Sequence, residues 1–106
     1  MPSDAPLWVA CTTVALEDDA RRLAREAVSL GLAACAQWEA IRSCYRWDGQ
    51  VQDEGEWRLT FKTLGHALPS LHDWVHAQHP YALPQWVAWP AQASGPYLGW
   101  VAAGLA

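Results

Sequence analysis

The sequence YRWDGQVQDEGEWRLTFKT, which spans Tyr45–Thr63, carries the strongest structural signal in the chain. Two arms rich in aromatic and β-branched residues flank Asp48-Gly49, a dipeptide that supplies the positive φ angles of a tight type I′ turn. The second arm alternates with a period of two, so one face is apolar and the other polar. The apolar face comprises Trp57, Leu59 and Phe61, and the polar face comprises Glu56, Arg58, Thr60 and Lys62. The pattern predicts a long antiparallel hairpin whose apolar face needs a cover.

The chain before this hairpin predicts a strand, a helix and a second strand. Leu7–Val14 is apolar and β-branched, which favours a buried strand. Acidic residues 17–19 favour a helix start, and Gly31 suits the helix end. Leu32–Ala40 starts a second strand that runs through Ile41 into the hairpin, with an irregularity expected near Glu39–Ser43 and a bulge at Gly55. The apolar face of the helix comprises Ala20, Leu23, Ala24, Ala27 and Leu30.

The chain after the hairpin predicts a helix, a strand and a terminal helix. Leu64, Leu68, Leu71 and Val75 recur at helical spacing, with a proline in the first turn. A proline-rich connector at 79–84 leads to a short strand, 85–89, closed by Pro90, and residues 94–106 form the last helix. This order predicts an α+β, ferredoxin-like split βαβ sandwich with an antiparallel sheet. We expect one domain over 1–106, a flexible lead at 1–6, and two helices on one sheet face with the other face open.

Composition excludes several classes of protein. The net charge is -4 and Lys62 is the single lysine, which argues against a nucleic-acid partner. No apolar run approaches the roughly 20 residues of a membrane span, and the N-terminus has no signal-peptide pattern. We therefore expect no contact with a membrane. Three cysteines without CxxC spacing favour reduced thiols, so we expect a cytoplasmic protein. Eight tryptophans favour a subunit interface, although several half-exposed aromatic side chains would also account for them.

A set of short motifs runs along the chain in a characteristic order. In this order and spacing the motifs resemble those of the divalent-cation tolerance family, CutA, from Leu7 to Val101. They are Cys11-Thr12-Thr13, Leu32-Ala33-Ala34-Cys35, Tyr45-Arg46-Trp47-Asp48-Gly49, Glu56, Lys62-Thr63, His79-Pro80-Tyr81 with Pro84, and Tyr97-Leu98-Gly99-Trp100. The resemblance implies a ferredoxin-like protomer in a tight homotrimer, and a link to tolerance of divalent cations, especially copper. One departure is Pro84-Gln85, where the family usually has Pro-Glu.

The resemblance also implies a metal site. Cys11, Glu56 and His79 match residues proposed as ligands in the family, and thiolate and imidazole suit copper or another divalent cation. They lie far apart in the sequence, so the fold or the trimer must bring them together. The alternative is a buried cysteine, a paired glutamate and a histidine that fixes a turn.

A second candidate is a ligand cleft between subunits. Its residues are polar or aromatic groups that a core would not select, and they are Cys35, Trp47, Glu56, Lys62, His79 and Tyr81. A buried pair of Lys62 and Glu56 that stabilises the trimer explains two of them equally well. His72 and His76 have zinc-site spacing, but no third ligand is evident, so we expect an exposed polar stripe.

Motifs for catalysis are missing, since the chain has no nucleophile elbow, no phosphate-binding glycine loop and no pair of carboxylates in a recognisable acid-base setting. The missing motifs argue against an enzyme, and the resemblance implies the rest of the prediction. We predict a non-enzymatic, trimeric protein of the divalent-cation tolerance type that binds copper, another divalent metal or a small ligand between subunits. The alternative is a structural or signalling trimer that recognises a metabolite or a protein partner and has only an indirect link to metals. A small-molecule enzyme is the third alternative.

Overall fold

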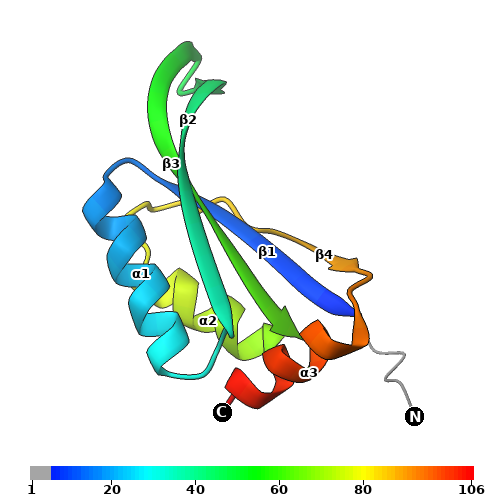
Figure 1. The fold of residues 1–106 in the computed structure, drawn as a ribbon. Helices are drawn as coiled ribbons and strands as arrows, with labels where there is room; N and C mark the ends of the chain where they lie inside the picture. The colour runs from blue at the N-terminus through cyan, green and yellow to red at the C-terminus, as the bar shows by residue number, and fades with distance from the viewer. Residues whose placement is uncertain (1–5) are drawn as a thin grey trace.

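The computed structural model describes residues 6–106, which form a four-stranded antiparallel sheet and three helices (Figure 1). The strand order is β2-β3-β1-β4, as the predicted ferredoxin-like split βαβ fold requires. The predicted lead at 1–6 lies, apart from Pro6, outside the described residues. The elements are β1 (Leu7–Val14), α1 (Glu17–Ser29), β2 (Cys35–Trp47), β3 (Gln50–Leu64), α2 (Leu68–Gln78), β4 (Val87–Ala91) and α3 (Gly95–Gly104).

The β2–β3 hairpin is regular along its whole length. Its pairing runs from Cys35 opposite Lys62 to Trp47 opposite Gln50 without a change of register. A two-residue turn closes it, with φ of 52° at Asp48 and 76° at Gly49, as a type I′ turn requires. The predicted irregularity at 39–43 and the predicted bulge at Gly55 are therefore wrong. Both faces of the hairpin are largely exposed around 39–43 and Gly55. No buried face therefore imposes an alternation of apolar and polar residues on this part of the sequence.

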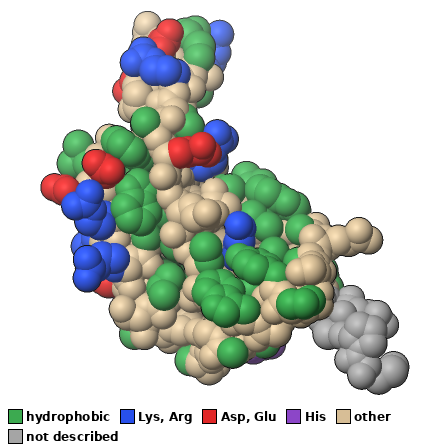
Figure 2. Space-filling view, in the orientation of Figure 1, with side chains coloured by type: hydrophobic (Ala, Val, Ile, Leu, Met, Phe, Trp, Pro, Cys, Tyr) green, Lys and Arg blue, Asp and Glu red, His purple; other side chains and the backbone are tan. Residues whose placement is uncertain are grey.

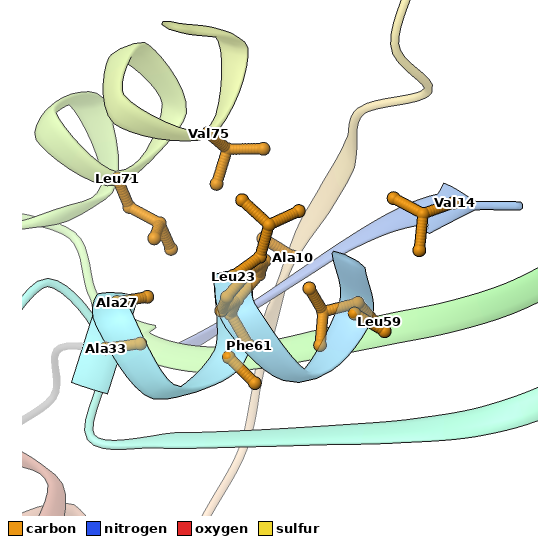
Figure 3. Packing of buried hydrophobic residues seen from close by; sticks show 11 residues of the cluster. Ala10, Val14, Leu23, Ala27, Ala33, Leu59, Phe61, Leu71 and Val75 are labelled. Atoms are coloured by element: carbon orange, nitrogen blue, oxygen red, sulfur yellow. The ribbon is translucent and has the colours of Figure 1, made fainter. Parts of the chain in front are cut away.

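The main core lies between one face of the sheet and the helices α1 and α2. Figure 3 shows Phe61 and Leu59 of β3 close to Leu23 of α1, with side chains of α2 completing the layer. The predicted cover of the apolar face is confirmed. The fully buried members include Ala10, Val14, Ala20, Leu23, Ala27, Leu59, Phe61, Leu71 and Val75.

The end of α1 corrects two predictions. Gly31 has φ of 71°, and the N–H groups of Gly31 and Leu32 donate to the carbonyls of Val28 and Ala27, which is a Schellman motif. Leu30, predicted in the core, is the helix cap and is 53% exposed. Because the N–H groups of Leu32 and Ala33 are used in this cap, β2 begins at Cys35 rather than at Leu32.

Two later boundaries also differ from the sequence patterns. Leu64 is the last residue of β3 and not part of α2, which begins at Leu68. Pro90 lies inside β4, opposite Trp8, instead of closing the strand. The strand tolerates this proline because β4 is at the sheet edge, where a missing N–H is least costly.

The second face of the sheet is partly covered, whereas the sequence predicts it to be open. The helix α3 buries Val101 against Leu7 and Val9 of β1, and the Lys62 ammonium lies 5.9 Å from the centre of the Tyr97 ring. Figure 2 shows hydrophobic side chains gathered around this region, whereas the hairpin that projects beyond the body carries hydrophobic and charged side chains side by side. No helix in the described part of the chain is long and apolar enough to span a membrane.

Candidate functional site

His79 is held at the end of β1 by hydrogen bonds to both of its ring nitrogens. Its Nε2 atom lies 2.9 Å from Thr12 Oγ1 and 3.0 Å from the Thr13 carbonyl oxygen. Its Nδ1 atom accepts the Tyr81 backbone N–H at 3.0 Å. A carbonyl oxygen can only accept, so Nε2 carries the proton and the lone pair of Nδ1 is occupied. The imidazole therefore anchors the proline-rich connector to the sheet.

Burial lowers the pKa of His79 below its ordinary value, and the hydrogen bond to the Thr13 carbonyl opposes this only in part. The unfolded chain then takes up a proton near the usual histidine pKa before the folded chain does. The contribution of neutral His79 to the free energy of unfolding is therefore fully present above about pH 6.5. It is lost as the pH falls below that value, toward the lowered pKa of the folded chain.

We expect His79→Gln to flatten the acid side of the stability profile. Glutamine retains an N–H donor for the Thr13 carbonyl, but it has no proton to gain between pH 7 and pH 5. The slope removed is at most about 1.4 kcal/mol per pH unit. Urea unfolding at a series of pH values measures it, with exposed His66→Gln as the control. An unchanged slope in His79→Gln would contradict the assignment.

Glu56 and Tyr81 form the second part of the site. Glu56 is buried on β3, with 7% of its surface exposed, and its carboxylate accepts the Tyr81 hydroxyl at 2.8 Å. The rings of His79 and Tyr81 lie 5.0 Å apart. Burial raises the pKa of Tyr81, and the bond to the Glu56 carboxylate raises it further. Three of the predicted site residues therefore meet in one protomer.

We expect Glu56→Gln to lower the pKa of Tyr81, because a neutral amide no longer disfavours the phenolate. The pKa of Tyr81 is expected to move toward its ordinary value of 10. Ultraviolet titration of tyrosinate measures the change, and Tyr81→Phe identifies the Tyr81 signal. An equally high Tyr81 pKa in the Glu56→Gln variant would assign the shift to burial alone.

The remaining predicted residues lie elsewhere on the sheet. Cys35 is opposite Lys62 in the β2–β3 register, and Trp47 is next to the hairpin turn. Glu56 and Lys62 are six residues apart on one extended strand, which separates them by about 20 Å. The predicted Lys62–Glu56 pair therefore cannot form within one chain. In a single protomer the predicted cleft residues therefore form three separate groups. These are Glu56 with His79 and Tyr81, Cys35 with Lys62, and Trp47 alone.

Comparison with known proteins decides the family. Residues 8–104 match the model of the CutA1 divalent ion tolerance protein. The chain belongs to the CutA1 family. It is 41% identical over 95 residues to the divalent-cation tolerance protein CutA of Thermus thermophilus, covering 88% of this chain and 92% of that relative. It is 37% identical to human protein CutA over 87 residues, covering 80% of this chain but 49% of the human protein, so it spans about half of that relative.

Solved CutA structures confirm the fold. The structure of CutA from Synechococcus elongatus PCC7942 is 39% identical, covers 100% of this chain and 95% of its own, and has a TM-score of 0.93. A structure of the same protein complexed with a Bis-Tris molecule has a TM-score of 0.89, with 99% and 98% covered. The predicted family resemblance is thereby confirmed.

Within one CutA1 protomer, the three predicted metal ligands have separate partners. The Cys11 sulfur lies 3.5 Å from Thr60 Oγ1, while Glu56 bonds Tyr81 and His79 bonds Thr12. Residues 6–106 contain no group of three His, Cys, Asp or Glu side chains that could hold a metal ion within one protomer. A site built from this set requires residues of more than one chain.

Thr12 also belongs to the candidate site, although its motif in the sequence indicates no role for it. It is fully buried on β1 and meets His79 from a position 67 residues away in the sequence. The signal that could have found it is a pair of adjacent hydroxyl side chains, Thr12-Thr13, in an otherwise apolar strand. A buried hydroxyl needs a partner, and His79 of the connector provides it here.

Proposed function

We propose that this chain is a non-enzymatic divalent-cation tolerance protein that assembles as a homotrimer and binds copper, another divalent cation or a small ligand between subunits. The observation that carries the proposal is the family match over residues 8–104. The separation of the candidate residues into three groups within one protomer supports a site shared between subunits. The proposed location is the cytoplasm, since the free thiols Cys11, Cys35 and Cys44 suit a reducing compartment.

The projecting hairpin supports self-association. β1 ends at Val14, opposite Trp57, so the hairpin from Ile41 and Glu56 to its turn is a two-stranded ribbon (Figure 1). Such a ribbon is marginally stable alone in water. Its apolar side chains are exposed, and both sheet edges, β2 and β4, lack a neighbouring strand within the described chain. The exposed side chains are Tyr45, Trp47 and Val51.

Light scattering tests the assembly directly. We expect the mass of three protomers at micromolar concentration. A mass of one protomer would contradict both the trimer and the shared site.

Calorimetry with Cu²⁺ tests the metal site. Thiolate, imidazole and carboxylate suit copper, so we expect Cys11→Ala/His79→Ala to weaken binding at least about tenfold. Cys44→Ala removes an exposed thiol outside the proposed set and serves as the control. Equal affinities for the double variant and the unmodified protein would overturn this copper site.

A second candidate function is that of a structural or signalling trimer that recognises a small molecule or a protein. The Bis-Tris complex of the Synechococcus relative supports it, because a small polar molecule binds that protein. A thermal-shift screen that includes Bis-Tris distinguishes the two functions, since a ligand of the native state raises its stability. Stabilisation by small molecules but not by Cu²⁺ would favour the second candidate.

A further inference from the structure

Glu56 and Lys62 carry opposite charges at the two ends of one face of β3. Six residues separate them, which is an even number, so both side chains leave the strand on the face opposite Leu59 and Phe61. The strand runs from the projecting hairpin to α3 (Figure 1). Glu56 therefore lies toward the hairpin and Lys62 toward α3, about 20 Å apart.

The Glu56 carboxylate has no positively charged partner in its own chain. It is 7% exposed and accepts the Tyr81 hydroxyl at 2.8 Å, but within residues 6–106 it forms no salt bridge with Lys, Arg or His. One hydrogen bond from a neutral group offsets only part of the cost of burying a charge. A cation in contact with Glu56 would therefore stabilise this part of the protein.

Lys62 is the cation of β3 that has no carboxylate partner in the described chain. The other one, Arg58, lies 3.1 Å from Glu39 of the neighbouring strand. Lys62 is half-buried, and its ammonium faces the Tyr97 ring at 5.9 Å rather than an acid. It is also the single lysine of the sequence.

We propose that Lys62 of each subunit forms an ion pair with Glu56 of the partner subunit, and this inference rests on the proposed homotrimer. The separation of about 20 Å along one strand prevents the pair within a chain. In a closed ring of identical subunits, each chain presents one patch to one neighbour and a different patch to the other. Every Lys62 then meets a Glu56, and the ammonium enters the shared site beside Tyr81.

Carbodiimide cross-linking of the full chain tests which carboxylate Lys62 contacts. The carbodiimide activates a carboxylate, the lysine amine displaces it as a urea, and an amide remains between the two side chains. We expect chains of doubled mass on a denaturing gel. Trypsin cleaves after Arg58 and so places Glu56 and Lys62 in separate peptides, which mass spectrometry should find joined. A link from Lys62 to any other carboxylate would overturn the proposal.

Lys62→Arg is the matched control for the cross-link. It keeps the positive charge and the ion pair, but a guanidinium does not form the amide. This variant should retain the mass of three protomers in light scattering and lose the link at position 62. A link to Glu56 that persists in Lys62→Arg would assign the cross-link to another amine and overturn the proposal.

A cycle of neutral variants tests whether the two residues act as a pair. Glu56→Gln and Lys62→Met each leave one buried charge unpaired. Each should therefore raise the protomer concentration at half-dissociation at least about a hundredfold. The double variant leaves neither charge and should dissociate less readily than either single variant. Arg25→Met removes one positive charge from an exposed position on α1 and should leave dissociation unchanged.

Light scattering over a range of protein concentrations measures dissociation, and circular dichroism establishes that each variant is folded. Unchanged dissociation in Lys62→Met, or strictly additive effects in the double variant, would overturn the ion pair and leave the proposed trimer in place. The mass of one protomer for the unmodified protein would overturn both.

Discussion

Phe61→Ala is expected to reduce the free energy of unfolding by about 3–5 kcal/mol. Phe61 is fully buried on β3 and packs in the cluster formed by the sheet, α1 and α2 (Figure 3). Truncation removes the apolar contact of the ring and leaves a cavity that the close-packed surroundings fill only in part. Urea unfolding at a fixed protomer concentration measures the loss, because association also contributes to apparent stability.

The matched control for Phe61→Ala lies on the same strand. Val51 is 64% exposed near the hairpin turn, and Val51→Ala is expected to change stability by no more than about 0.5 kcal/mol in a single protomer. A loss in Phe61→Ala as small as that of the control would show that the core tolerates the cavity. A larger loss in Val51→Ala than 0.5 kcal/mol would instead indicate that the hairpin end is buried by another subunit.

Trp89→Glu is expected to convert the proposed trimer into a monomer and so reduce the scattering mass about threefold. Trp89 lies on the edge strand β4, opposite Val9, and is 43% exposed in one protomer. If β4 meets another subunit, the substitution buries an unpaired carboxylate there, which costs several kcal/mol. Light scattering over a range of protein concentrations measures the change.

Leu16→Glu controls for the effect of a new charge in place of an exposed apolar side chain. Leu16 is 63% exposed immediately before α1, where an acidic side chain is compatible with the helix dipole. This variant should keep the trimer mass. Dissociation of both variants would assign the loss to net charge, and a stable Trp89→Glu trimer would place the interface away from β4.

The hairpin and the two covering helices could be predicted from the sequence because each depends on local chemistry. Asp48-Gly49 suits one kind of turn, and the alternation of Trp57, Leu59 and Phe61 suits one face. The errors lie where tertiary context overrides local pattern. Pro90 resembles a strand terminator, yet an edge strand accommodates it, and Leu30 has helical spacing but caps the helix.

The candidate site could be predicted only in part. Glu56, His79 and Tyr81 do meet, but the Tyr81–Glu56 bond joins residues 25 positions apart and depends on the path of the connector. Cys35 and Trp47 have side chains that suit a ligand cleft, but their positions in the β2–β3 register place them away from Glu56, His79 and Tyr81. Register follows from the turn, so a strict count outward from Asp48-Gly49 would have kept these residues apart.

The position of β1 in the sheet has a consequence for synthesis of the chain. β1 is the first element, yet it is a central strand whose neighbours are β3 and β4. Its apolar sequence therefore stays unpaired on the ribosome until residues 57–64 and then 87–91 have been made. At about 5–20 residues per second this delay lasts several seconds, during which an exposed apolar strand is prone to aggregation. Binding of a nascent-chain chaperone to Leu7–Val14 would protect the protein during this interval.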